Sequence, residues 1–326
     1  MERECTVSRL ITRRGFLAAA ATAAVVPGVA FAEDRPSPGR GVRVRFLGSG
    51  AAGWKPYWAQ NPHIRRQSSV LLDGRALIDF TMCSFDKLPR GCRPEVLFQT
   101  HSHGDHYHPE AAVKSGVKRM YVHETWAGAA RAEVAAAAAK LGLPSPEVRA
   151  LQFGRFVEEC GMRFMSVPAN HSTSRVTDGV LERTSLYLVE KGPARLLYAT
   201  DTGGICGDAA RMIGIDPHVR RENSPNGSGF IIPFVHTAKP ITALIMEATS
   251  GDTDDDFRMF VHSSVQTVAR TVDMLKRHER FSPPPGQYPY ITHLAGKYRA
   301  WPAERVNADI PSTLRAAYDG LDVVLG

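Results

Sequence analysis

The sequence predicts an α/β fold in which two β-sheets stack on one another and helices cover their outer faces. Three observations support this prediction. Strand-like runs occur in both halves of the 326-residue chain, helical patterns lie between them, and no repeat of fixed period divides the chain. Hydrophobic residues make up 43% of the sequence and charged residues 22%, which suits a globular protein with a sizeable core. One domain over residues 42–326 accommodates all of these elements.

The first 32 residues are predicted to be an export signal rather than part of the fold. Arg13 and Arg14 precede the apolar run 17–29, and Ala30-Phe31-Ala32 offers a small-x-small cleavage site. The run is too short for a permanent membrane helix. A disordered basic arm would explain the charge but not the alanine-rich run. The segment resembles twin-arginine signals, which implies the twin-arginine translocase as a partner and a periplasmic or secreted location. Residues 33–41, rich in Pro, Gly and charge, are read as a linker.

Charge and cysteine content narrow the class of protein. The formal net charge of +7 is spread along the chain, with no basic run that carries interleaved aromatic residues. This argues against a nucleic-acid groove and leaves a modest attraction for an anionic small-molecule substrate. Four cysteines follow the signal and none has CxxC spacing, so a cysteine zinc site is not expected. In an oxidising compartment, a Cys83–Cys92 disulfide and four free thiols are both open alternatives.

The first half of the chain is predicted to contain strands followed by one long helix. Alternating or continuous apolar runs predict strands at Val42–Leu47, Ser68–Leu72, Ala76–Asp79, Val96–Gln99 and Arg119–Val122. Asp73-Gly74 is a hairpin turn signal. Thr125–Leu141 is alanine-rich and predicts a helix that ends at Gly142. Asp79 ends an apolar strand, where an unpartnered charge is costly, so it is expected to orient a metal-binding histidine.

The second half continues the pattern with more strands and two helices. Strands are predicted at Phe153–Glu159, Met162–Val167, Ser185–Val189, Arg195–Ala199, Ala243–Met246, Tyr288–Thr292 and Val323–Leu325. Helices are predicted after His262, where apolar residues recur at helical spacing, and within residues 302–326. Residues 207–240 and the acidic segment 252–256 are expected to be loops. Trp54, Tyr57 and Trp58 either line a substrate mouth or pack against the core.

The strongest motif is the run His101-Ser102-His103-Gly104-Asp105-His106. A strand that ends in His-x-His would place both imidazoles on one side, because side chains alternate along a strand. Asp105 and His106 would then turn back toward a second ion beside the first. Imidazole with carboxylate suits Zn, Fe or Mn better than Ca or Mg. The motif therefore predicts a transition-metal centre.

This HxHxDH run, followed by His171, Asp201 and His293 in strand-end contexts, resembles the metallo-β-lactamase superfamily over roughly residues 42–300. The resemblance implies a four-layer αββα sandwich with two divalent metal ions, zinc with manganese or iron as alternatives. It implies that His101, His103 and His171 hold one ion. Asp105, His106 and His293 would hold the other, with Asp201 bridging the two.

Within that superfamily, the chain is most similar to the ribonuclease Z and cyclic-phosphodiesterase branch. Met246-Glu247-Ala248-Thr249 resembles its His-Glu-Ala-Thr, His262-Ser263-Ser264 its His-Ser-Thr, and residues 292–298 its Thr-His-Phe-Ser-x-Arg-Tyr. Two features depart from the branch: Tyr107-His108-Pro109 replaces a glycine after the motif, and no basic arm for tRNA is present. His108 is expected to be an exposed or rim residue.

The resemblance implies a hydrolase in which a hydroxide shared by two ions attacks an electrophile, most simply the phosphorus of a phosphodiester. Asp105, Glu247 and His262 are the candidate catalytic residues, with His262 as general acid and Glu247 orienting it. A purely structural place near a helix start is the alternative for His262. A lactamase-type or lactonase-type acyl hydrolase is the alternative function, and an iron-dependent oxidoreductase is a weaker one. The oligomeric state stays open, with a homodimer as one option.

Overall fold

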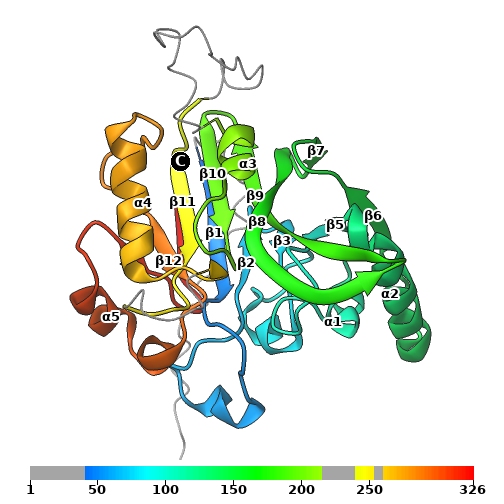
Figure 1. Ribbon diagram of the computed structural model, residues 1–326. Coiled ribbons are helices and arrows are strands. Elements are labelled where there is room, and N and C mark those ends of the chain that lie inside the picture. The colour runs from blue at the N-terminus through cyan, green and yellow to red at the C-terminus, as the bar shows by residue number, and fades with distance from the viewer. Residues whose placement is uncertain (1–40, 215–238, 253–259) are drawn as a thin grey trace, which may run out of the picture. The chain divides into compact units, whose positions relative to one another are not determined.

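A computed structural model describes residues 41–214, 239–252 and 260–326, which form two seven-stranded sheets (Figure 1). The first sheet contains β1 (Val42–Gly48), β2 (Ser69–Leu72), β3 (Ala76–Ile78), β4 (Val96–Phe98), β5 (Arg119–His123), β6 (Glu147–Leu151) and β14 (Asp322–Leu325). Its strand order is β14-β1-β2-β3-β4-β5-β6. Strands β3 to β6 run parallel, whereas β14, β1, β2 and β3 pair antiparallel.

The second sheet contains β7 (Phe156–Glu159), β8 (Met162–Thr177), β9 (Val180–Lys191), β10 (Ala194–Ala199), β11 (Ala243–Glu247), β12 (Tyr290–Thr292) and β13 (Arg315–Ala316). Its strands lie in the order β13 to β7. Strands β10 to β13 run parallel, and β7 to β10 pair antiparallel. The carboxyl ends of parallel strands in both sheets are therefore available to carry polar side chains.

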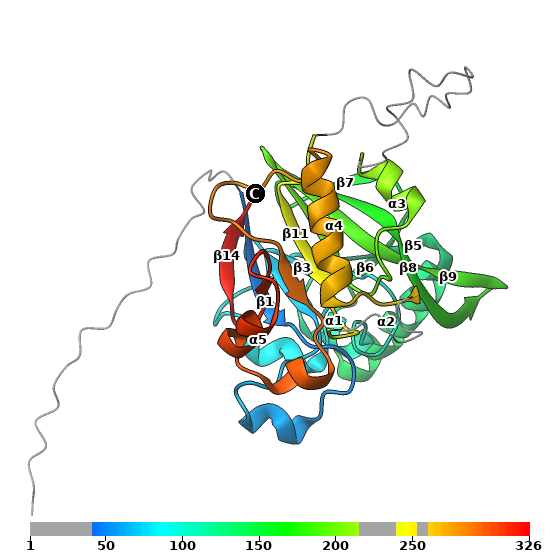
Figure 2. The ribbon, with the colours of Figure 1, turned by 60° about the vertical axis from the view of Figure 1, so that its left-hand side comes forward.

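Three apolar cores hold these layers together. The central core lies between the sheets, where the rings of Phe98 and Phe164 stack with their centroids 4.0 Å apart. A second core lies under α1 (Pro109–Lys114) and α2 (Ala127–Leu141), outside the first sheet. A third lies under α3 (Gly207–Met212), α4 (Val265–Arg277) and α5 (Ala303–Asp309), outside the second (Figure 2). The predicted layering of two sheets with outer helices is confirmed.

Helix boundaries follow the expected local chemistry. The helix predicted to end at Gly142 does so, because that glycine adopts the left-handed conformation with φ 63°. The Ser264 side chain caps α4 by accepting a hydrogen bond from the Thr267 backbone N–H. His262 therefore lies before the cap and does not itself cap the helix.

The structure changes three predictions and settles one alternative. Residues Gly207–Met212, predicted to be part of the 207–240 loop, form helix α3 and pack against the second sheet. The strand predicted to end at Val167 continues as β8 to Thr177 and pairs with β9 in a long hairpin. His171 thus lies inside a strand, not past its end as predicted, because bulges after Pro168 let the pairing resume. The cysteines Cys83, Cys92, Cys160 and Cys206 are all free thiols, so the Cys83–Cys92 disulfide is absent.

Several predictions fall outside the described residues. They are the export signal 1–32, linker residues 33–40, the centre of the 207–240 loop, and residues 253–256 of the acidic segment. In the part of the chain that the structure describes, no helix is long and apolar enough to cross a membrane.

Candidate metal centre

The HxHxDH motif lies in a loop rather than in a strand. Strand β4 ends at Phe98, so alternation along a strand is not what aligns His101 and His103, and that predicted reason is wrong. Instead, the backbone N–H groups of His106 and Tyr107 both donate to the His103 carbonyl, at 2.9 and 2.8 Å. This tight turn folds Asp105 and His106 back toward the first two histidines. His101 and His106 are completely buried.

Three further polar residues approach from strand ends in an unusual backbone conformation. Asp79 directly follows β3, Asp201 follows β10, and His293 directly follows β12. Their φ angles are 53°, 51° and 55°, a left-handed conformation that residues with a Cβ rarely adopt. Such strain persists where the surroundings over-determine the conformation, commonly at functional sites. Here it turns the chain sharply at the edge of the sheet, where the side chains meet.

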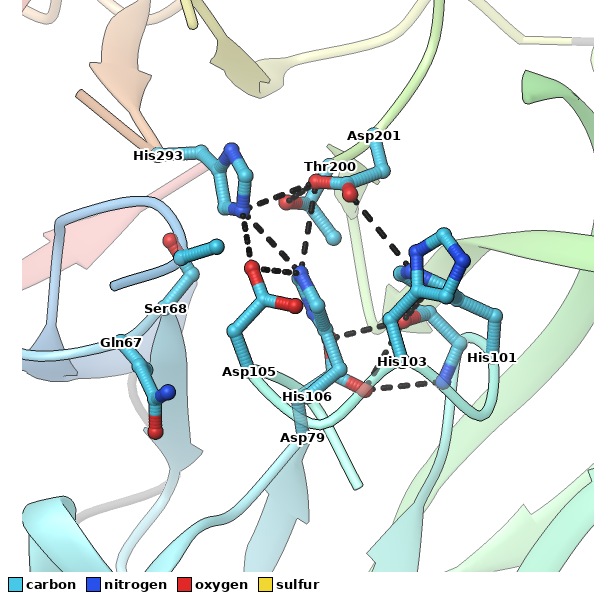
Figure 3. A network of polar contacts seen from close by, with 12 residues as sticks. Gln67, Ser68, Asp79, His101, His103, Asp105, His106, Thr200, Asp201 and His293 are labelled. Carbon is cyan, nitrogen blue, oxygen red and sulfur yellow. Dashed lines mark hydrogen bonds and ion pairs between the residues drawn. The ribbon is translucent and has the colours of Figure 1, made fainter. Parts of the chain in front are cut away.

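The seven predicted ligands come together in two groups that share Asp201. Figure 3 labels all of them except His171. One group is His101, His103, His171 and Asp201, and the other is Asp105, His106, Asp201 and His293. Within each group the potential ligand atoms all lie within 4.8 Å of one another. The groups can therefore hold two metal ions side by side.

The two carboxylate oxygens of Asp201 face different groups. Oδ2 lies 3.5 Å from His101 Nε2 and 3.7 Å from His171 Nε2. Oδ1 lies 3.4 Å from His106 Nε2 and 3.1 Å from His293 Nε2. One carboxylate that presents a separate oxygen to each set of imidazoles has the arrangement of a bridging ligand.

In four of the histidines a hydrogen bond holds the outer ring nitrogen, Nδ1. The inner nitrogen, Nε2, which faces the other candidate ligands, is thereby left to bind a metal ion. His106 Nδ1 donates to Asp79 at 2.7 Å, and His171 Nδ1 donates to the Val261 carbonyl at 3.0 Å. His101 Nδ1 lies 3.0 Å from Thr100 Oγ1, and His293 Nδ1 lies 2.6 Å from Thr249 Oγ1. Metal-binding histidines are typically oriented in this way.

Two threonines connect these histidines to buried carboxylates in the same pattern. Thr100 Oγ1 donates to Asp79 at 2.8 Å and therefore accepts from His101. Thr249 Oγ1 donates to Glu247 and therefore accepts from His293. Each arrangement fixes the tautomer in which the inner Nε2 carries the lone pair. The sequence did not indicate either role, because the threonine hydroxyl reaches its partner only in the folded loop.

The electrostatics of the cluster suit cations. Burial, together with the neighbouring His106, lowers the pKa of His101 well below its ordinary value, so this imidazole is neutral, as a ligand must be. Burial also lowers the pKa of His106, but the carboxylates of Asp201, Asp105 and Asp79 outweigh it and raise that pKa well above its ordinary value. Three carboxylates around one imidazole form a strongly cation-attracting site.

The inner nitrogen atoms converge without enough hydrogen-bond partners of their own. The Nε2 atoms of His106 and His293 lie only 3.1 Å apart. Among the described residues, the buried His101 Nε2 has no hydrogen-bond partner. A buried polar atom without a partner is costly, and a metal ion would supply one. The donor set therefore fits metal ions of the kind that bind imidazole and carboxylate.

Asp79 is a buried support of the candidate metal site. It is completely buried, and its Oδ1 also accepts hydrogen bonds from Gln99 Nε2 at 2.9 Å and the Thr100 backbone N–H at 2.8 Å. Burial raises the pKa of Asp79 overall, although the charge of the adjacent His106 acts in the opposite direction. The expected contact of Asp79 with a histidine of the motif is confirmed.

Asp79→Asn is expected to weaken metal binding by about 10–100-fold, because the acceptor that orients His106 is lost. Metal titration of the apo-protein would measure this change. Asp73→Asn is a matched control, since Asp73 also follows a strand with positive φ but pairs with Lys191 at 2.7 Å. Equal metal affinity of both variants and the wild type would contradict the role given to Asp79.

A third polar group adjoins the cluster. Glu247, at the end of β11, is completely buried, and its Oε1 accepts from His262 Nδ1 at 3.0 Å and from the Thr202 backbone N–H at 2.6 Å. The ligand atoms of Glu247, His262 and His293 lie within 4.8 Å of one another. Burial lowers the pKa of His262, but its hydrogen bond to Glu247 and the charge of that carboxylate raise it overall. His262 is thus placed to hold a proton beside the cluster.

Glu182 is a support of the motif loop that sequence reasoning missed. This buried residue of β9 accepts from the Ser102 backbone N–H at 2.7 Å and from the Ser102 hydroxyl. Burial raises the pKa of Glu182 overall, although the hydrogen bonds from Ser102 act in the opposite direction. No local pattern could reveal a contact between residues 80 positions apart.

His108 occupies the N-cap position of α1 and joins none of the metal groups.

Comparisons with known proteins give a family match for part of the chain and several structures of similar fold. Residues 85–219 match the family described as the β-lactamase superfamily domain. Similar solved structures include zinc-bound PqqB from Methylobacterium extorquens, at 16% identity over 86% of this chain and 99% of that chain, with a TM-score of 0.58.

A diphosphatase of the PhnP family is similar at 18% identity over 86% of this chain and 97% of that one, with a TM-score of 0.54. The short form of human tRNase Z is similar at 16% identity over 87% and 99%, with a TM-score of 0.54. No curated protein matches the chain in sequence. These likenesses show the fold, which is the metallo-β-lactamase fold.

Proposed function

We propose that this chain, which carries a metallo-β-lactamase superfamily domain, is a dinuclear metal-dependent hydrolase whose substrates are phosphodiesters. The observation that carries the proposal is the arrangement of Asp201, whose two oxygens face separate groups of ligand side chains. His101, His103 and His171 would hold one ion, and Asp105, His106 and His293 the other. Zinc is the expected metal, with manganese or iron as alternatives.

Two bound cations would supply Lewis acidity for a hydrolytic water and for the negative charge that develops on the substrate. The protein's own contribution is orientation. Asp79 and Glu247 hold the ligand histidines through Thr100 and Thr249, and Glu182 holds the loop that carries the motif. Fixed donors at a buried site need little reorganisation during the reaction.

His262 supports phosphoester cleavage in particular. Its Nδ1 is held by Glu247, so its Nε2 is available to carry a proton to the departing oxygen. Its ring centroid lies 5.0 Å from that of His171 and 5.9 Å from that of His293, at the edge of both metal groups. A poor alkoxide leaving group needs such a donor. The diphosphatase and tRNase Z named above indicate that this fold hosts phosphoester chemistry.

The metal-loaded protein is expected to hydrolyse bis-p-nitrophenyl phosphate faster than nitrocefin or a simple lactone. Chelation should abolish the activity, and zinc or manganese should restore it, because the proposed reaction depends on bound cations to lower the pKa of the attacking water. Steady-state rates on the three substrates, with elemental analysis of the purified protein, measure this. Turnover of nitrocefin or the lactone alone would favour the acyl hydrolase, and iron without zinc or manganese, together with no hydrolysis of any of the three substrates, would favour the oxidoreductase.

A further inference from the structure

Arg299 is a cationic side chain near the metal cluster that the ligand set and the proton donor leave unused. It lies in the short 3-10 helix η6 (Gly296–Ala300), six residues after His293. The segment that contains it runs beside the loop 50–52, where the Ala51 backbone N–H donates to the Leu294 carbonyl at 3.2 Å. In Figure 1 the ribbon of residues 53–60, which follow this loop, is blue, and that of the segment 296–300 is orange-red. This pairing places the segment that carries Arg299 directly after the candidate ligand His293 and beside the loop 50–52.

The guanidinium group is held in place but is not neutralised. Its Nη2 donates to the Ala52 carbonyl, while its buried Nη1 has no hydrogen-bond partner among the described residues. Two other cationic side chains do form ion pairs. Arg66 pairs with Asp86 and Asp319, and Lys297 pairs with Asp252 and Asp309. Within the described ranges Arg299 has no carboxylate partner at ion-pair distance. The buried Nη1 therefore lacks an acceptor, which an anion could supply.

The charge of Arg299 interacts with one of the candidate metal ligands. Burial lowers the pKa of Arg299 overall, whereas the negative charge of the Asp105 carboxylate acts in the opposite direction. Asp105 is one of the proposed metal ligands. An anion that contacts the cluster from this side would therefore also be attracted by the guanidinium.

An aromatic surface adjoins the guanidinium. The Arg299 Cζ lies 5.7 Å from the ring centroid of Trp58, a cation–π distance that favours a fixed orientation. Tyr57 contacts Trp58 edge to face at 5.7 Å and is 71% exposed. The guanidinium group of Arg299 therefore lies beside two aromatic rings. This combination suits an anionic group that is attached to an organic moiety.

We propose that Arg299 and Trp58 form a subsite that binds the anionic group of the substrate and selects charged phosphoesters over neutral esters. The proposal rests on the hydrolase function above and names the substrate class of that site. The planar guanidinium donates two parallel hydrogen bonds to phosphate oxygens, a geometry that lysine cannot reproduce. Arg299 is in this view a specificity-determining residue, and Trp58 orients it.

Calorimetric titration of the metal-loaded full chain with inorganic phosphate tests the subsite directly. Arg299→Ala is expected to raise the Kd for phosphate by about tenfold or more, since a charged hydrogen bond is lost. Arg299→Lys should recover only part of the affinity, and metal content should stay unchanged in both. Arg163→Ala is the matched control, because Arg163 also stacks on an aromatic ring, that of Phe156 at 4.0 Å, but pairs with Glu190. An unchanged Kd in Arg299→Ala overturns the proposal.

Kinetics separate a specificity role from a structural one. In Arg299→Ala, kcat/KM for bis-p-nitrophenyl phosphate should fall mainly through KM, while kcat/KM for neutral p-nitrophenyl acetate stays level. Equal losses on both substrates would show a structural role and overturn the proposal. If the wild type turns over no phosphodiester but phosphate binding still weakens in Arg299→Ala, the anion subsite stands and the proposed hydrolase function fails.

Discussion

Asp201→Asn is expected to lower metal content below two ions per chain and to reduce phosphodiester hydrolysis more than any other single change. Each Asp201 oxygen faces a different histidine group, so an amide would remove the negative charge shared by both proposed metal positions. The loss should exceed the 10–100-fold effect that is typical of residues behind the ligands. Elemental analysis and steady-state kinetics on the purified variant measure it.

Asparagine is preferred to alanine for this test because the residue adopts φ 51°, a conformation that asparagine tolerates and alanine does not. A folding defect is thereby separated from loss of the ligand. Asp208→Asn, at an exposed position in α3, is the control for removal of one carboxylate. Full metal content and full activity in Asp201→Asn would refute the bridging role.

His262→Ala is expected to leave both metal ions in place and to cut turnover by about 10²-fold or more, the usual effect of losing a general acid. Glu247 accepts from His262 Nδ1, and the raised pKa of His262 favours its protonated form. The loss should be larger for a diester with an aliphatic alcohol as leaving group than for a p-nitrophenyl ester, since the better leaving group needs less protonation. Rates on both substrates, measured beside metal content, test this.

His278→Ala is the control for His262→Ala, because His278 lies at the C-cap of α4, at the opposite end of that helix from the segment that carries His262. A fall in metal content would show that His262 is a ligand rather than a proton donor. Unchanged turnover on the aliphatic diester would remove His262 from the mechanism.

The centre of the candidate site could be predicted because its chemistry is local. Three imidazoles and a carboxylate within six residues are hard to explain without a metal, whereas His171, Asp201 and His293 were expected as ligands from the resemblance to the metallo-β-lactamase superfamily. The prediction for Asp79 succeeded for a related reason, since a charge at the end of a buried strand needs a partner. The export signal in residues 1–32 stays a prediction.

The reasons behind two predictions were wrong, although the residues do lie together as expected. His101 and His103 are aligned by a hydrogen-bonded turn, not by strand alternation, and His171 lies within the long strand β8. Backbone bulges and tight turns depend on pairing with distant strands. A window of a few residues cannot reveal them.

The sequence by itself determined the ligand types, their order and the alternation of strands and helices, because these follow from composition and short-range periodicity. Only the tertiary structure decided which oxygen of Asp201 meets which histidines, and that Thr100 and Thr249 connect ligands to buried carboxylates. It alone brought Arg299 beside Trp58 and Glu182 beneath the motif loop. The physical reason is that hydrogen bonds and charges act over a few ångströms in space, whatever the separation of the residues along the chain.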